Sequence, residues 1–316
     1  WKAKGLPLNM ARGNPCHEQH RLSRPMFDIL TSESSMLCED GTDCMNYGSP
    51  FGIPEARRMM GSLLDLPPEN IYVLGNSSLN IMYEQVARSM IHGVMGHAPF
   101  MEQMRERPLK WLCPVPGYDR HFKITESFGF NMINIPMDEN GPDMDMVEDL
   151  VNNDPTVKGI WCVPKYSNPT GIIYSDDVIR RFACLKPAAA DFRIYWDNAY
   201  CVHYLTDKRP SILEILSECK KAGNGDMVFE FASTSKITVA GSGISCFASS
   251  ENNLNDFKPV LTTMTIAYNK TNQLCHARYL PDKDAVLSHM EKHRSIIAPK
   301  FQLVLDTLEK ELGAYS

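Results

Sequence analysis

A lysine in the stretch FASTSKITVAG, residues 231–241, is the first residue of this chain whose surroundings suggest chemistry. The stretch begins as an apolar strand, continues through hydroxyl side chains to Lys236, and ends in small residues. We expect Lys236 at the polar end of a buried strand, where an ammonium group is costly unless another group pairs or reacts with it. A lysine amine reacts with carbonyl compounds to form a Schiff base, so this stretch predicts a covalently held cofactor.

Asp197 and Tyr200 lie three residues apart in WDNAY, directly after an apolar run. A carboxylate facing the ring nitrogen of pyridoxal phosphate keeps that nitrogen protonated, so that the ring can accept electrons. Tyr200 is then expected to donate to the phenolic oxygen of the ring, with Asn168 of SNPTG (167–171) as a second donor. The structural alternative is that Asp197 caps the next helix and that SNPTG is a plain turn.

The segment LGNSSLN, residues 74–80, follows a strand-like run and opens a helical pattern. Free backbone N–H groups and the helix dipole make such a helix start a site for anions, although an ordinary cap explains the same residues. Tyr118 in PGYDRHF is expected to stack on the pyridine ring, unless it is a simple loop aromatic. The residues predicted to hold the cofactor phosphate are Asn76, Ser77, Ser78, Ser233 and Ser235.

Short apolar runs alternate with helical patterns along the middle of the chain, which favours an α/β fold with a mostly parallel sheet and helices on both faces. Ligands bind at the carboxyl ends of the strands in such sheets. The polar motifs above each follow an apolar run, so we expect them to meet there. The predicted strands cover residues 110–116, 132–137, 158–164, 192–198, 227–233 and 243–249, and the main predicted helices cover 54–65, 78–96, 143–152, 175–186, 210–222 and 284–314.

The composition excludes several other classes of protein. The 316 residues are 43% hydrophobic and 22% charged with a formal net charge of −6, so no basic surface for nucleic acid and no membrane span is expected. Ten scattered cysteines without a CxxC pair suggest reduced thiols and a cytoplasmic protein. No metal site is expected, because HEQH (17–20) is one residue short of the HExxH spacing and lies in a predicted extended arm.

Five motifs occur in the order and spacing of fold-type I pyridoxal-phosphate aminotransferases of class I: NYGSPFGIPEAR, PGYDRHF, SNPTG, WDNAY and STSK. The opening ARGNP, the phrase CPVPGYDRHF and the later NKTNQLCHARYL resemble the bacterial aspartate aminotransferase-like subgroup. The resemblance implies the aspartate aminotransferase-like fold, with a large cofactor-binding domain over 51–283. Residues 1–50 then form the N-terminal arm and the start of a small domain. Residues 284–316 form a helix leading toward a C-terminal small domain that the printed sequence lacks.

The resemblance also implies roles for single residues. Lys236 corresponds to the Schiff-base lysine, and Asp197 to the aspartate at the pyridine nitrogen. Tyr47 resembles a tyrosine that reaches the neighbouring subunit's phosphate, which implies a homodimer with shared active sites. Gly13, after Arg12, resembles the glycine that closes over the substrate carboxylate. The remaining assignments are Asn168 and Tyr200 at the phenolic oxygen, Asn168 also at the substrate, Tyr118 in stacking, and Arg12 and Arg278 as candidates for the substrate side-chain carboxylate.

Two departures from the family pattern matter. Ile244 stands where the family commonly has a phosphate-binding arginine, and Lys270 and Asn272 are the candidates to replace it, facing the other subunit's cofactor. The family's arginine for the substrate α-carboxylate would lie beyond Ser316, so we expect the printed chain to bind the cofactor but to bind amino acids poorly.

The function implied is a ping-pong transamination in which Lys236 moves the substrate α-proton. Aspartate is the expected amino donor and 2-oxoglutarate the expected acceptor. One alternative is a lyase or decarboxylase on the same fold, because the cofactor chemistry divides after the α-carbon bond breaks. The other is a pyridoxal-phosphate-binding regulator without catalysis, although no DNA-binding segment precedes the fold.

Overall fold

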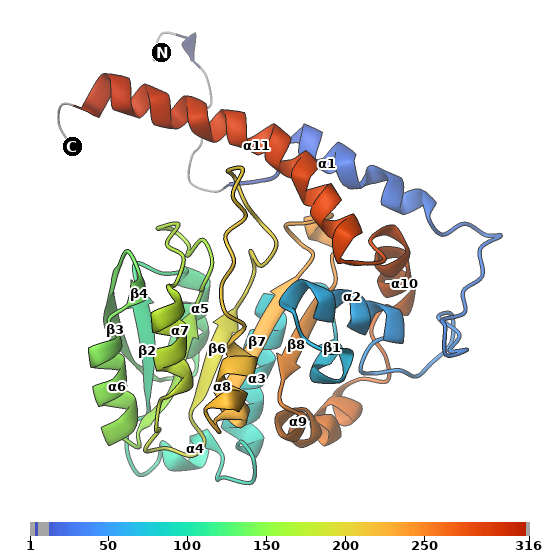
Figure 1. The fold of residues 1–316 in the computed structure, drawn as a ribbon. Coiled ribbons are helices and arrows are strands. Elements are labelled where there is room, and N and C mark those ends of the chain that lie inside the picture. Colours follow the sequence, from blue (N-terminus) through green and yellow to red (C-terminus); the bar gives the residue numbers. More distant parts are fainter. Residues whose placement is uncertain (1–3, 6–12, 314–316) are drawn as a thin grey trace.

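The structure is a computed structural model that describes residues 4–5 and 13–313, so Arg12 lies outside the described residues. An eight-stranded sheet runs through its centre (Figure 1), in the order β1-β8-β7-β6-β5-β2-β3-β4. Its strands are β1 (Ile71–Val73), β2 (Lys110–Val115), β3 (Asn131–Asp138), β4 (Gly141–Pro142), β5 (Val157–Cys162), β6 (Arg193–Asp197), β7 (Val228–Ser233) and β8 (Ser245–Ser249).

Five neighbouring strands are parallel to one another: β3, β2, β5, β6 and β7. At one end of the sheet β4 pairs antiparallel with β3, and at the other β8 pairs antiparallel with both β7 and β1. The helices are α1 (His17–Ser23), α2 (Pro54–Leu64), α3 (Ser78–His92), α4 (Phe100–Gln103), α5 (Asp119–Ser127), α6 (Met144–Asn153), α7 (Asp176–Ala183), α8 (Ile215–Lys221), α9 (Glu251–Met264), α10 (Lys270–Tyr279) and α11 (Lys283–Leu312). The predicted mixed α/β fold with a mostly parallel sheet is confirmed.

Each central strand is buried on both faces, because its alternate side chains enter two separate cores. On β6, Ile194 and Trp196 point into the core beneath α2, α6, α7 and α8, whereas Tyr195 points into the core beneath α3, α5 and α9. This burial explains why these strands are continuous apolar runs in the sequence. It also fixes the register, since a one-residue slip would exchange the two sets of side chains.

Because β2, β5, β6 and β7 are parallel, their carboxyl ends all lie along the same side of the sheet, which we call the carboxyl edge. PGYDRHF, SNPTG, WDNAY and STSK each follow or complete one of these strands. The topology therefore places these motifs together at the carboxyl edge, as the sequence predicted. α11 lies beside α1 above the sheet (Figure 1), and its N-terminal half is packed against the turn that follows β7.

The structure differs from the sequence prediction in several elements. The arm predicted to be extended contains α1, so HEQH lies in a helix, although its spacing still lacks one residue. Lys236 was expected at the end of a buried strand, but β7 ends at Ser233 and Lys236 lies in an exposed turn. α10 was not predicted, because it buries polar side chains such as Lys270 and Gln273 instead of a regular apolar stripe.

No helix of the described residues combines the length and apolarity needed to cross a bilayer.

Candidate active site

A cleft of about 820 Å³ opens at the carboxyl edge of the sheet. Six of the residues predicted from the sequence line it: Gly13, Tyr118, Asn168, Asp197, Tyr200 and Lys236. They come from the arm and from the segments after β2, β5, β6 and β7. The cleft thus joins residues that are up to 223 positions apart in sequence, from Gly13 to Lys236.

Asp197 is the buried acid of this cleft, with only 5% of its surface exposed. Its Oδ2 is 3.0 Å from Nε2 of His121, which is 1% exposed and stacked on Trp161. Its Oδ1 is buried and has no hydrogen-bond partner. A buried carboxylate oxygen without a donor is costly, so this atom fits a ligand N–H in the cleft.

His121 is a site residue that the sequence reasoning missed. It lies three residues after Tyr118, on the first turn of α5, and the two rings make an edge contact at 5.0 Å. The helical spacing in PGYDRHF could have signalled this, because residues three apart share one helix face. Gly117 positions Tyr118: a Cβ there would lie 2.4 Å from the Pro114 carbonyl oxygen, so a larger residue would displace the loop.

Lys236 and Tyr200 face each other across the cleft. The Lys236 Nζ lies 4.9 Å from the centre of the Tyr200 ring. Burial raises the pKa of the Tyr200 hydroxyl, and the nearby Asp197 and Tyr118 raise it further. Tyr200 is therefore a hydrogen-bond donor at neutral pH. Asn168 is exposed at the mouth of the cleft, on the loop after β5.

Four histidines hold the turn that carries Lys236. The Lys236 carbonyl lies 3.2 Å from His203 Nε2, and the Thr238 hydroxyl lies 3.0 Å from His276 Nε2. The Ile237 carbonyl lies 2.9 Å from Nε2 of both His289 and His293, which belong to α11. Both can donate to this oxygen when the proton sits on Nε2. His203 and His276 thus have a backbone and a hydroxyl partner, respectively, in the turn.

The start of α3 lies against the same turn. The Ser235 hydroxyl donates to the Asn76 carbonyl at 3.4 Å, which joins two segments predicted to bind phosphate. Ser77 is the N-cap residue of α3, but its side chain makes no capping hydrogen bond, and the first turn contains no acidic residue. Free N–H groups at the start of this 15-residue helix fit an anion. Ser78 is half-buried beside them, and Ser233 is buried at the end of β7.

The candidates for replacing the phosphate arginine have other partners. The Lys270 ammonium donates to the carbonyls of Asn46, Tyr47 and Gly48 at 2.5, 3.0 and 3.1 Å. These three bonds use all of its N–H groups. Asn272 donates to the carbonyls of Ser242 and Gly243, both at 3.1 Å.

Ile244, at the position where the family has its arginine, is buried. Tyr47 does not reach the cleft of its own chain, and its side chain is 81% exposed.

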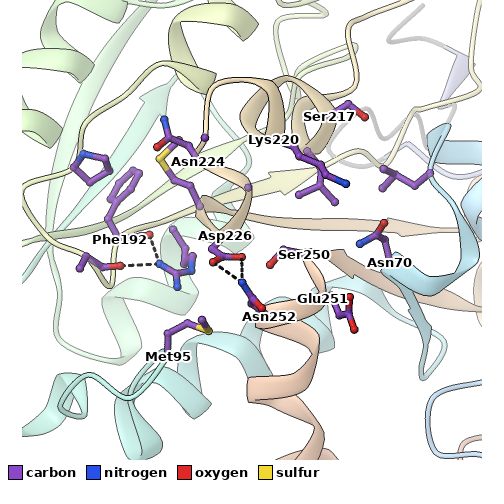
Figure 2. A pocket seen from close by; sticks show the side chains of 18 of the residues that line it. Asn70, Met95, Phe192, Ser217, Lys220, Asn224, Asp226, Ser250, Glu251 and Asn252 are labelled. Atoms are coloured by element: carbon purple, nitrogen blue, oxygen red, sulfur yellow. Dashed lines mark hydrogen bonds between the residues drawn. The ribbon is translucent and has the colours of Figure 1, made fainter.

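A larger cavity of about 1010 Å³ lies at the opposite, amino-terminal ends of β6 and β7 (Figure 2). Several of its polar side chains have partners: Asn252 donates to Asp226, and Arg193 donates to the backbone carbonyls of Ala190 and Phe192. None of the buried unpaired polar atoms of the described residues lies on its wall. We therefore take the smaller cleft around Asp197 as the candidate active site.

Comparisons with known proteins agree with this geometry. The family profile described as aspartate amino-transferase matches residues 1–316. The aspartate aminotransferase of Corynebacterium glutamicum is 45% identical over 314 residues, which are 99% of this chain and 72% of that protein. A crystal structure of an aspartate transaminase from Corynebacterium glutamicum has a TM-score of 0.94 at 44% identity and covers 100% of this chain and 73% of that chain.

A more distant structure shows the same fold. It is an alpha-aminoadipate aminotransferase from Thermus thermophilus, solved with N-(5'-phosphopyridoxyl)-L-leucine, with a TM-score of 0.69 at 17% identity over 93% of this chain and 67% of that chain. The family profile and the relatives from Corynebacterium glutamicum together determine the family. The chain belongs to the aspartate aminotransferase family, and it is a transaminase that uses pyridoxal phosphate.

Proposed function

We propose that this protein transfers the amino group of L-aspartate to 2-oxoglutarate in a ping-pong reaction. The observation that carries the proposal is the buried, unpaired Oδ1 of Asp197, a residue that lines the same cleft as Lys236. Aspartate as donor is supported by the name of the relative at 45% identity. 2-Oxoglutarate as acceptor is supported by the resemblance between the sequence motifs and the family.

The residues that line the cleft, together with the start of α3 beside the Lys236 turn, fit the cofactor group by group. Asp197 offers an unpaired acceptor to a ring N–H, and its contact with His121 holds the carboxylate in place. The start of α3 offers N–H groups to a phosphate. Tyr118 offers an aromatic face, and Asn168 and Tyr200 offer donors to the phenolic oxygen.

Pyridoxal phosphate, when bound, supplies a protonated ring that accepts the electron pair released at the substrate α-carbon. Lys236 would hold the cofactor through its amine between turnovers, and the freed amine would take the α-proton from the substrate and later return it. Contacts of His203, His289 and His293 with backbone carbonyls hold its turn in place. The amine can therefore move while the backbone that carries it stays fixed. Gly13 lies at the cleft, where the arm can close over the substrate carboxylate.

Two further parts of the proposal concern assembly and location. The exposed Tyr47 is proposed to reach the phosphate of a second subunit in a homodimer, where it supplies a donor that Ile244 cannot. A cytoplasmic location is proposed because all ten cysteines are free thiols.

The test is an assay of the full-length protein, purified with pyridoxal phosphate, against a panel of amino acids. We expect continued turnover of aspartate to oxaloacetate only when 2-oxoglutarate is present, with oxaloacetate and glutamate in equal amounts. Without an acceptor, aspartate should give no more than one oxaloacetate per active site. Loss of carbon dioxide or ammonia without a keto acid acceptor would favour the lyase or decarboxylase alternative. Cofactor binding with no turnover of any amino acid would favour the regulator.

A further inference from the structure

Two cysteines of the N-terminal arm form a buried dithiol. The sulfur atoms of Cys38 and Cys44 are 3.2 Å apart, and the two residues are 5% and 6% exposed. All ten cysteines of the chain are described as free thiols, and this pair alone among them has a sulfur–sulfur contact. The pair lies outside the cleft and plays no part in the proposed transamination.

The backbone holds these two side chains together. Cys38 N–H donates to the Thr42 carbonyl and Cys44 N–H donates to the Met36 carbonyl, both at 2.9 Å. Leu37 and Asp43 form the antiparallel bridge between these bonds. The two cysteines are therefore on opposite arms of a short hairpin. Their sulfur atoms, 3.2 Å apart, need to approach by only about 1.2 Å to reach the length of a disulfide bond.

We propose that Cys38 and Cys44 are a redox site that forms a reversible disulfide with hydrogen peroxide as the oxidant. In the first step one thiolate attacks a peroxide oxygen, which gives a sulfenic acid and releases water after proton transfer. In the second step the other thiol attacks that sulfur and releases a second water. Two thiols and one peroxide thus become one disulfide and two waters, with two electrons passed to the peroxide.

The charges around the hairpin affect the thiol pKa of Cys38 and of Cys44 differently. Burial has the largest effect and raises the pKa of both thiols. At Cys44 the contact with Cys38 and the cations of Lys270 and Arg278 offset part of this rise. At Cys38 the contact with Cys44 and the carboxylates of Glu55 and Asp40 raise the pKa further. Glu55 also raises the pKa of Cys44, more weakly than Lys270 lowers it. The Lys270 ammonium binds the carbonyls of Asn46 and Tyr47, shortly after Cys44 in the chain, so we assign the attack on peroxide to Cys44 and the closure of the disulfide to Cys38.

The location gives the disulfide a structural consequence. The segment 46–48 begins two residues after Cys44, and Lys270 holds its carbonyls. Arg278 also contacts the hairpin, through the Leu37 carbonyl at 3.4 Å. Oxidation would tie the hairpin at the base of the segment that presents Tyr47, so the redox state would restrain this part of the arm.

The test treats the reduced holoenzyme with hydrogen peroxide, blocks the remaining thiols by alkylation, and maps the peptides by mass spectrometry. We expect the peptide that contains both cysteines to lose two hydrogen atoms and two alkylation sites, and dithiothreitol to restore both. Cys184→Ser, which removes an exposed cysteine without a sulfur contact, should behave like wild type. Failure of wild type to form the linked peptide would overturn the proposal.

Two single variants test the order of attack. In Cys38→Ser, peroxide should produce a sulfenic acid at Cys44 that dimedone traps. In Cys44→Ser, trapping at Cys38 should be slower, because Glu55 and Asp40 raise the pKa of this thiol and leave less thiolate. Equal trapping in the two variants would contradict the assigned roles. Circular dichroism of each variant checks that it remains folded.

Discussion

Asp197 shows how much of the site depends on a single residue and its support. Its carboxylate is held by His121, which in turn is stacked on Trp161 inside the core. The sequence predicted Asp197 from its position after an apolar run. It did not predict His121, because the contact joins residues 76 apart whose closeness depends on the order of β2, β5 and β6.

Replacing Asp197 by alanine removes the acceptor for the ring nitrogen and leaves His121 without its partner. We expect kcat to fall by roughly 100-fold or more, which corresponds to about 3 kcal/mol of the activation barrier. Asp197→Glu should retain more activity, because it keeps the charge but moves it by one methylene. Steady-state kinetics with saturating cofactor measure both variants, and a wild-type kcat in Asp197→Ala would remove this residue from the mechanism.

Glu230 offers a second prediction at this scale. It is 1% exposed on β7, accepts from Asn198 at 3.0 Å, and lies beside Glu214. Burial, followed by the Glu214 carboxylate, raises its pKa well above the usual 4.5, with a smaller contribution from Asp65. The folded protein thus binds this proton more tightly than the unfolded chain, so the group costs stability as pH rises above about 4.5.

Glu230→Gln keeps the shape and removes this titration. We expect the variant to be more stable than wild type at pH 8 and the gain to shrink as the pH falls toward 4.5. Urea unfolding at several pH values measures the difference, with Glu69→Gln, on a surface turn, as the matched control. A constant difference across this pH range would contradict the assignment of a protonated Glu230.

At the scale of elements, the turn that carries Lys236 is in contact with α11 through His289 and His293. The apolar pattern of 284–314 predicted this helix almost to the residue, and the central strands were predicted equally well, since buried strands are continuous apolar runs. The contacts of His289 and His293 with Ile237 were not predictable, because nothing local to LSHMEKHR indicates which turn lies opposite. The same limit applies to α10, whose buried face is polar.

The burial of His293 against this turn predicts that the protein becomes less stable as the pH falls. Burial, with a contribution from His289, lowers the pKa of His293 from 6.5 to about 4. The unfolded chain therefore binds the proton more tightly, and wild-type stability falls as the pH decreases from about 6.5. The neighbouring groups are His289, Gln19 and the Ile237 carbonyl, none of which supplies a negative charge.

His293→Gln should remove part of this dependence. We expect wild type to lose about 1–2 kcal/mol more than the variant between pH 7 and pH 5. Chemical unfolding at the two pH values measures this, and His97→Gln, at an exposed position, serves as control. The idea fails if the variant and wild type lose the same stability on acidification.

At the scale of the whole molecule, the exposed Tyr47 and the sequence resemblance both favour a homodimer with shared sites. A tyrosine hydroxyl that donates to a phosphate is worth roughly 1.5–3 kcal/mol. Tyr47→Phe should therefore weaken cofactor affinity by about one to two decades while the dimer stays intact. Cofactor titration together with light scattering measures both quantities, with Tyr83→Phe as the exposed control. A wild-type protein that binds the cofactor tightly as a monomer would contradict the shared site.

The central claim is that Lys236 holds the cofactor, and borohydride reduction followed by peptide mapping tests it most directly. In wild type and in the control Lys186→Ala, we expect reduction to fix the cofactor on the peptide that contains Lys236, with loss of the yellow absorbance. Lys236→Ala should yield no such peptide and no transamination, while still binding the cofactor without a covalent bond. A borohydride-reducible adduct in Lys236→Ala equal to that of wild type would contradict the account.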